Sequence, residues 1–494
     1  MSKQRRRSPL LSLLFAPFVK CNGRAAASPA VVYQTPVSRP INDDHDAWHS
    51  YWTAQSQPWR TEPEIDLKRQ NELSARRSLV LDVEKGVYPF KGMKLSRADV
   101  EWLLAIHENG RGPVSWSDSN QRKREGLHLG GADLRGIDLS NLPLACLQGE
   151  VSSESKGKGL FQVLDGVDLE RASLAHAHLE NANLIGANLK KAYFFDAHLE
   201  GAKLLLAQLD GAHFSDAHLE EANLWNASLR GADFSNAHLE NAKLVGTNLE
   251  RTNFYRAHLE EADLAAAVLS DEKQVGPQLA DVYWDRANLA VVEWSQVKIL
   301  GEEWAAYQKH DPDGTPDELL RGTRNARLNR YERAVRANRQ LSIVLQAQGL
   351  NEDSARFAYR AQVLQKTAFR YKILISGISF KQRVQTFGAW LFSWFLFLIA
   401  GYGYRPSRSF LAYFLVISGF ATAYYLLGHA VGPSLSPLGA FVFSMTSFHG
   451  RGFFPGKNIS LDDPLTVLAA FEALVGLIIE VTFIATLTQR FFNR

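Results

Sequence analysis

The chain has 494 residues, of which 46% are hydrophobic and 22% are charged. This composition excludes a wholly disordered chain and a collagen-like chain. The formal net charge is only +3, so no overall field indicates nucleic acid or an acidic substrate as a partner. The two cysteines, Cys21 and Cys146, are too few for a disulfide framework or for a zinc site built from cysteines.

Residues 1–60 begin with a basic cluster, followed by an apolar run that Pro17 interrupts. A secretory signal peptide has a similar start. Here, however, the apolar run is short and broken. We therefore predict that residues 1–60 form a disordered basic tail, and we attach no nucleic-acid binding to so short a basic run.

Residues 61–126 are predicted to form a helical cap on the domain that follows. Ser96 and Asp99 have the spacing of a capping box, which pairs free backbone N–H groups at the start of a helix. We expect that helix to reach Gly110. A cap is needed because the open end of a repetitive β-structure exposes its core and unpaired backbone.

A repeat of five residues dominates the middle of the chain. From Leu164 to Leu269, all 22 positions spaced five apart are Leu or Phe. From Ala172 to Ala267, the residue two positions before each centre is small, and it is Ala in all but Thr247 and Thr252. A period of five fits neither a helix nor a strand. It fits a square coil in which the large and small residues point inward and the coils stack about 4.8 Å apart.

The repeats resemble the pentapeptide repeat family, whose motif is A-(D/N)-L-x-x. Examples are Ala182-Asn183-Leu184 and Ala232-Asp233-Phe234. The resemblance implies a right-handed quadrilateral β-helix. The same phase extends beyond the regular stretch at both ends, so we place this solenoid at residues 127–300, with inserted loops at 145–163 and 270–281.

Two sets of residues recur every 20 positions, which is one full coil of the predicted solenoid. One set should stack inside as a column of Phe, at Phe194, Phe214, Phe234 and Phe254. The other is the tetrapeptide Ala-His-Leu-Glu, which should place a column of His beside a column of Glu on one outer face. Its members are His178, His198, His218, His238 and His258 with Glu180, Glu200, Glu220, Glu240 and Glu260.

The His and Glu columns have three interpretations. The first is a solvated face that was copied when the coil was duplicated. The second is a row of imidazoles that senses pH, because neighbouring charged rings would repel one another. The third is divalent-metal binding between adjacent His, although no closed ligand set is specified. We therefore predict neither a metal nor another cofactor.

Residues 301–385 are predicted to form a helical connector. Two helical patterns, at 317–348 and 351–375, flank a turn at Gly349. They resemble a single tetratricopeptide-like hairpin. A lone hairpin has no stacked neighbours, so we interpret it as a rigid spacer or a self-association element.

Residues 386–494 are predicted to form a membrane domain. Residues 410–428 carry no charge, and residues 464–488 contain only Glu472 and Glu480, so each is long and apolar enough to cross a bilayer. Residues 387–403 are shorter and would form an interfacial helix or an additional membrane helix.

Basic clusters flank these stretches and orient them. By the positive-inside rule, all of the clusters prefer the cytoplasm, which places the solenoid there and residues 387–403 along the inner interface. The clusters contain Lys366, Arg370, Lys372, Lys381, Arg383, Arg405, Arg408, Arg490 and Arg494.

Residues 435–454 combine a short apolar helix with a glycine-rich turn, which reads as a re-entrant pore-like loop. The order of helix, short helix, Gly-x-Gly and helix resembles the two-helix pore module of potassium channels, whose filter reads T-V-G-Y-G-D. Arg451 replaces the filter tyrosine, so the resemblance implies the architecture more than potassium selectivity. The filter-like residues are Thr446, Ser447, Phe448, His449, Gly450, Arg451 and Gly452.

Glu472 and Glu480 are candidates to line the pore from its inner helix, because ionisable groups at membrane depth usually face a cavity or a partner. The alternative is a buried carboxyl that is hydrogen-bonded within the helix bundle or kept protonated. The two readings stay open here.

No nucleophile and base pair or phosphate loop emerges, so we do not predict an enzyme. The leading hypothesis is a multi-pass, ion-channel-like protein of the cell membrane. It would be a homotetramer, with a cytoplasmic solenoid that acts as a sensor or docks a protein partner. The first alternative is a membrane-tethered interaction scaffold that does not conduct. The second is a gyrase-binding mimic of DNA, because residues 165–269 hold 16 acidic and 8 basic residues, a net charge of −8.

Overall fold

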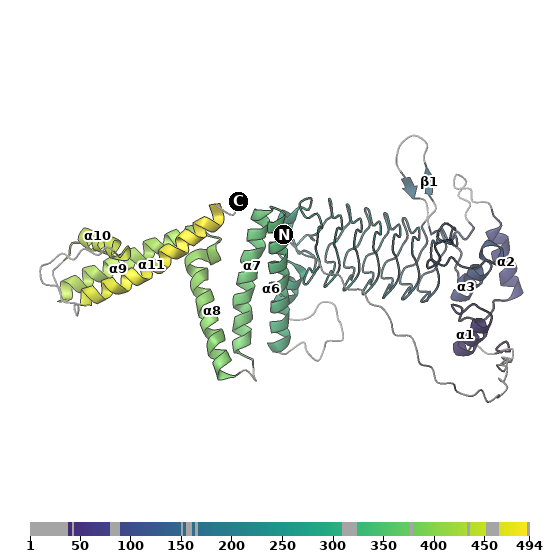
Figure 1. The fold of residues 1–494 in the computed structure, drawn as a ribbon, viewed down its shortest axis with the longest axis horizontal. Coiled ribbons are helices and arrows are strands. Elements are labelled where there is room, and N and C mark those ends of the chain that lie inside the picture. The colour runs from purple at the N-terminus through teal and green to yellow at the C-terminus, as the bar shows by residue number, and fades with distance from the viewer. Residues whose placement is uncertain are drawn as a thin grey trace, which may run out of the picture.

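The structure is a computed structural model, and the molecule is an elongated rod (Figure 1). N-terminal helices cover one end of a solenoid, a helical hairpin crosses its other end, and apolar helices extend beyond the hairpin. The structure describes residues 38–41, 44–79, 89–149, 152–154, 161–163, 166–308, 324–375, 379–431, 435–450 and 464–491.

The five-residue prediction for the solenoid is confirmed. Parallel bridges join residues that are 20 apart, such as Asn183 with Lys203, so each coil has four sides of five residues. From Leu169 to Leu269, no central Leu or Phe is more than 4% exposed. Thr247 takes the place of one inward Ala, and its hydroxyl donates a hydrogen bond to a backbone carbonyl instead of being buried unpaired.

The Phe column also forms as predicted. Successive rings of Phe194, Phe214, Phe234 and Phe254 stack with centroids 4.6, 4.7 and 5.4 Å apart. All four side chains are fully buried. The column belongs to a continuous core that it shares with the inward Leu and Ala side chains of the coils.

Replacing Phe214 with Ala removes a ring with a stacked neighbour on each side. Large-to-small changes of this kind cost about 3–5 kcal/mol. We expect the free energy of unfolding of the Phe214→Ala chain to be lower by this amount. The variant should therefore unfold at a lower denaturant concentration. Phe195→Ala is the control, because Phe195 is 49% exposed. Equal losses in the two variants would contradict the inward column.

The two insertions are shorter than predicted. Gln148 bridges both His128 and Asn183, so the coil continues through Gly149 instead of ending at residue 145. The prediction failed there because Leu147 occupies the position of the small residue and Gly149 that of the large one. Strands β1 (Ser152–Glu154) and β2 (Phe161–Val163) then form an antiparallel hairpin that projects from the solenoid.

The second insertion ends before residue 281. Gln278 bridges Asn253, so stacking resumes at Gln278. Within the insertion, Val275 bridges Ile299 of the final coil. Val275 is also buried, so part of the predicted loop belongs to the core.

Helices α1 (His45–Ala54) and α2 (Leu67–Arg77) precede the solenoid. The prediction of disorder for the whole of residues 1–60 is wrong for α1, where Trp48 and Trp52 are buried. Residues 1–37 lie outside the described part of the chain. The helix packs against the segment that follows it: the Arg60 guanidinium lies 3.6 Å from the Trp52 ring centroid, and the Trp52 indole N–H donates a hydrogen bond to the Glu62 carbonyl.

The predicted capping box is confirmed at helix α3 (Arg97–Ala105), where Ser96 and Asp99 exchange both hydrogen bonds. The helix does not continue to Gly110, because the short α4 (His107–Gly110) has left-handed residues inside it. Arg97 donates hydrogen bonds to two carbonyl oxygens of the first coil, each at 3.1 Å, and α3 thereby caps the solenoid.

The other end of the solenoid is closed by the connector helices. These are α5 (Gly301–Tyr307), α6 (Arg324–Ala347) and α7 (Asn351–Ile373), which follow the 3-10 turn η1 (Trp294–Gln296). Four of their apolar side chains are continuous with the solenoid core, namely Ala337, Leu341, Leu345 and Phe357.

Side-chain amides of the hairpin pair with the free edge of the last coil. Gln348 accepts a hydrogen bond from the Leu289 N–H at 2.8 Å and donates one to the Ala287 carbonyl at 2.6 Å. Gln340 accepts one from the Asp281 N–H at 2.8 Å. The hairpin predicted as a spacer is therefore also the C-terminal cap.

Glu302 lies buried under this cap, where its carboxyl accepts a hydrogen bond from the Ala280 N–H. Burial raises the pKa of Glu302 from 4.5 to about 7. The folded chain therefore holds the proton of the Glu302 carboxyl more tightly than the unfolded chain does. The stabilisation that this gives the folded state is lost as the pH rises from about 4.5 to about 7.

We expect the free energy of unfolding to fall between about pH 4.5 and pH 7 more steeply in the wild type than in Glu302→Gln, because the amide does not ionise. Denaturant unfolding at several pH values measures the two slopes. Identical slopes would show that Glu302 does not titrate in this range.

The C-terminal part contains α8 (Phe380–Ala400), the 3-10 turn η3 (Gly401–Gly403), α9 (Pro406–Val431), α10 (Pro437–Phe448) and α11 (Pro464–Phe491). The helices α8, α9 and α11 are long and apolar enough to cross a membrane. The first of these spans is Phe380–Gly403, longer than the stretch predicted from residue 387.

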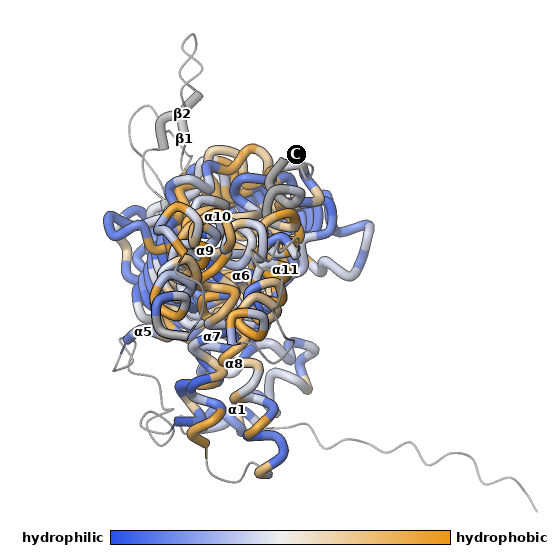
Figure 2. The backbone as a smooth tube through the Cα atoms, turned by 90° about the vertical axis from the view of Figure 1, so that its left-hand side faces the viewer, coloured by the Kyte–Doolittle hydropathy of each residue, from blue (hydrophilic) through white to orange (hydrophobic). Residues whose placement is uncertain are grey.

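The long helices of this part differ in direction. In Figure 1, α8 lies beside α7, whereas α9 and α11 run side by side away from the rest of the molecule. The end-on view in Figure 2 shows hydrophobic residues along α9, α10 and α11. Many of their large apolar side chains are exposed, including Phe410, Leu411, Phe414, Leu415, Leu474 and Leu477.

Candidate functional site

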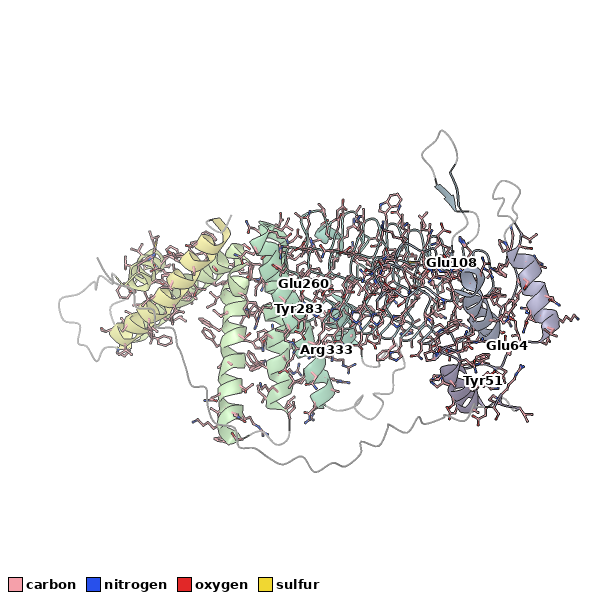
Figure 3. The ribbon with its side chains drawn as sticks, turned by 45° about the vertical axis from the view of Figure 1, so that its right-hand side comes forward. Tyr51, Glu64, Glu108, Glu260, Tyr283 and Arg333 are labelled. Atoms are coloured by element: carbon pink, nitrogen blue, oxygen red, sulfur yellow. The ribbon has the colours of Figure 1, made fainter. Side chains whose placement is uncertain are left out.

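Two features combine polar groups in an unusual setting, and the first is on the solenoid. The imidazoles of His178, His198, His218, His238 and His258 stack nearly parallel, with centroids 4.7–5.0 Å apart. The ring of Tyr283 continues the stack 4.2 Å beyond His258. Figure 3 shows Tyr283 and Glu260 at the end of the solenoid near α6.

Each of these His is paired with the Glu two positions later. The distances from Nδ1 to Oε1 are 2.9–3.2 Å in all five pairs. We call the five pairs, from His178–Glu180 to His258–Glu260, the His–Glu ladder. The two predicted columns are confirmed.

The Glu side chains of the ladder are more buried than a solvated face requires. Glu180 is only 6% exposed and the others 28–34%. The second carboxylate oxygen of every one of them is buried without a hydrogen-bond partner. At the first rung, the hydrogen bond with Glu180 raises the pKa of His178 despite its partial burial.

The ladder brings potential metal ligands together. Three groups have donor atoms within 4.8 Å of one another: His238, Glu240 and His258; Glu180, His198 and Glu200; and Glu200, His218 and Glu220. Each group includes a carboxylate, whereas adjacent His alone were considered from the sequence. Oxygen and imidazole donors of this kind suit a divalent cation.

The second feature lies among the apolar helices. Glu472 of α11 is fully buried, and the Tyr424 hydroxyl of α9 donates a hydrogen bond to its carboxylate at 2.7 Å. The Ser444 hydroxyl of α10 donates to the other oxygen. For Glu472 the structure therefore has the arrangement of the second reading, a carboxyl hydrogen-bonded within the bundle, and it links three helices.

The C-terminal end of α10 reaches the middle of both long helices. Phe448 packs against Ile417 of α9 and Ile479 of α11. Gly476 of α11 touches the same end, because a Cβ atom there would lie 2.0 Å from the Phe448 carbonyl oxygen. Only glycine permits this approach.

The filter-like residues sit at this end of α10. The Thr446 hydroxyl bonds to the carbonyl of Phe443 within its own helix, and Ser447 is buried. Gly450 has a left-handed backbone, with φ +67°. Arg451 and Gly452 lie outside the described residues.

Glu480 meets His449 at the same depth. Their side chains are 3.3 Å apart, and the His449 Nε2 also lies 3.1 Å from the Tyr413 hydroxyl. Both are partly exposed, at 34% for Glu480 and 37% for His449. Polar groups from α9 and α11 thus meet His449 at the C-terminal end of α10.

Basic groups gather where the connector meets the apolar helices. Lys366 of α7 lies 3.7 Å, and the guanidinium of Arg408 of α9 4.7 Å, from the Phe397 ring centroid of α8. Burial and the neighbouring Arg408 lower the pKa of Lys366. In the described part of the chain, neither cation has a carboxylate partner.

The sequence pointed to Glu472, Glu480 and His449, but not to Tyr424 and Ser444, which bind Glu472, nor to Gly476, which contacts Phe448. A Tyr or Ser within an apolar run was an available signal. Their role depends on which helices pack together, and the local sequence pattern does not specify this.

Comparison with known proteins bears on the solenoid. The family model for pentapeptide repeats matches residues 163–204, 207–244 and 232–271. This part of the chain is a pentapeptide repeat domain. No curated protein matches the chain.

Similar solved structures are those of other pentapeptide repeat proteins. HetL from the cyanobacterium Nostoc is 22% identical, covers 33% of this chain and 87% of its own, and has a TM-score of 0.20. Rfr23 from the cyanobacterium Cyanothece is 28% identical over 32% of this chain and 91% of its own, with a TM-score of 0.15. QnrB1, a plasmid-mediated fluoroquinolone resistance protein, is 17% identical, and the match covers 33% of this chain and 77% of the QnrB1 chain, with a TM-score of 0.14.

Gly476→Ala should loosen α10 from α11, because the added methyl group overlaps the Phe448 carbonyl. We expect a lower thermal unfolding temperature for the chain in detergent. Gly419→Ala in α9 is the matched control, since nothing lies within 4 Å of a Cβ atom there. An unfolding temperature equal to that of the control would contradict the close contact.

Proposed function

We propose that this chain is an ion-channel-like membrane protein in which α9, α10 and α11 form one subunit of a pore. The observation that supports this best is the position of α10. It is a 12-residue apolar helix whose C-terminal end lies halfway along the two long helices. A short helix that ends at membrane depth, followed by a left-handed glycine, is how pore loops present backbone carbonyls to an ion.

Buried polar contacts support a fixed position for α10. The pairing of Glu472 with Tyr424 and Ser444 satisfies a carboxyl that would otherwise be costly in an apolar surrounding. Such a network holds a helix in one place better than apolar contacts alone, which allow sliding. A pore needs this rigidity because its filter is set by backbone positions.

The direction of the helices supports a cytoplasmic pentapeptide repeat domain. The start of α9 and the end of α11 both lie on the side of α7 and the solenoid (Figure 1). Lys366, Arg405 and Arg408 are on this same side, and basic residues prefer the cytoplasm. On this proposal α8 lies along the inner membrane surface beside α7, with Trp390 and Trp394 at headgroup depth.

One subunit does not enclose a conduit, so the proposal includes a homotetramer, as in the pore family that the sequence resembles. The exposed apolar faces of α9 and α11 would contact lipid and the neighbouring subunits. Glu480 would then attract cations toward the end of α10, where its carboxylate lies 3.3 Å from His449.

Reconstitution of the full chain in liposomes with a potassium gradient tests conduction. We expect cation flux from the wild type and loss of flux in Gly450→Val, because a β-branched residue is strained at φ +67°. Gly419→Ala should conduct like the wild type. Cross-linking of each sample reports whether four chains still assemble.

A wild type that inserts and assembles but shows no flux at any voltage or pH would overturn the channel proposal. That result would favour the membrane-tethered scaffold, in which exposed side chains of the pentapeptide repeat domain, such as Trp225, dock a protein partner. The gyrase-binding alternative rests on the acidic solenoid alone, and a supercoiling assay with the full chain tests it.

A further inference from the structure

The His–Glu ladder has no part in the proposed pore, and its geometry points to a ligand of its own. We infer that the ladder binds a divalent cation of the zinc type, and that the principal site consists of His238, Glu240 and His258, in its last two pairs. This inference goes beyond the proposed function and does not depend on conduction.

The distances fit a metal site. Oε1 of Glu240 lies 3.2 Å from Nδ1 of His238 and 3.8 Å from Nδ1 of His258. Zinc is bound at about 2.0–2.2 Å by nitrogen and oxygen, which places tetrahedral ligands about 3.4 Å apart. The rings of His238 and His258 stack 4.7 Å apart, so both must turn out of the stack toward Glu240 to bring all three atoms onto one ion. Two His and one Glu leave a fourth position open for water.

The unpaired carboxylate oxygens are an independent indication of a ligand. A buried carboxylate oxygen normally has a hydrogen-bond donor or a cation beside it. Oε2 of Glu240 has neither among the described residues. The same is true of Oε2 of Glu180, whose side chain is only 6% exposed. Glu180 belongs to the group with His198 and Glu200.

Hydrogen balance allows the cation to enter. A neutral imidazole carries one ring hydrogen, which the empty ladder places on Nδ1 so that it can donate to the Glu. When a cation binds, that hydrogen moves to Nε2, and the Nδ1 lone pair is free to bind the ion. No proton has to leave the protein, and the carboxylate supplies negative charge.

The donors also predict selectivity. Imidazole nitrogen suits zinc, nickel and copper, whereas magnesium and calcium prefer sets made of oxygen alone. The backbone bridge between His238 and His258 holds the two residues one above the other before the ion binds. This fixed spacing of the backbone lowers the ordering cost of binding.

Calorimetric titration of the full, metal-stripped chain with ZnCl2, prepared without a histidine tag, tests the inference. We expect saturable zinc binding, no comparable binding of magnesium, and a higher unfolding temperature with zinc. A variant with all five ladder His changed to Gln should lose both effects. These His lie on the surface, so this variant should still fold.

A single substitution gives a second measurement if the fivefold variant does not fold. His258→Gln removes only the site formed by His238, Glu240 and His258, so it should bind fewer zinc ions per chain than the wild type. The matched control is His213→Gln, because His213 stacks on Tyr193 in a different column and belongs to none of the three groups. Equal zinc binding by His258→Gln and the wild type, or no zinc binding by the wild type, would overturn the inference.

Discussion

The stacking of one coil on the next by backbone hydrogen bonds is the constraint on which the rest of the structure depends. Each side donates and accepts along the rod axis, as between the Leu199 N–H and the His218 carbonyl at 2.7 Å. Residues 20 positions apart are therefore held above one another. A repeated residue becomes a column, and this creates both the buried Phe stack and the His–Glu ladder.

The same stacking makes the two ends of the solenoid its weak points, since the last coil has no partner for its backbone. The chain solves this with side chains rather than with further strands. Arg97 pairs with carbonyls at the first coil, and Gln348 pairs with both kinds of group at the last. The second cap is the hairpin, and its helix α7 contacts α8, so the cap also connects the rod to the apolar helices.

Polar contacts define the apolar part as well, for a different reason. Apolar side chains gain little by packing on one another where lipid is the alternative, so specific positions depend on hydrogen bonds and close backbone approach. Glu472 and Gly476 supply these two kinds of contact to α10. The result is a short helix held between two long ones.

The sequence by itself determined the period of the solenoid, the residues of each column, the capping box at Ser96 and the apolar segments. These features repeat or lie close together in the chain, so local pattern is enough. The tertiary structure alone decided that Gln348 caps the last coil and that Glu472 is hydrogen-bonded within the bundle. Each of these depends on a partner distant in sequence, and local hydrophobic pattern does not encode which distant groups will meet.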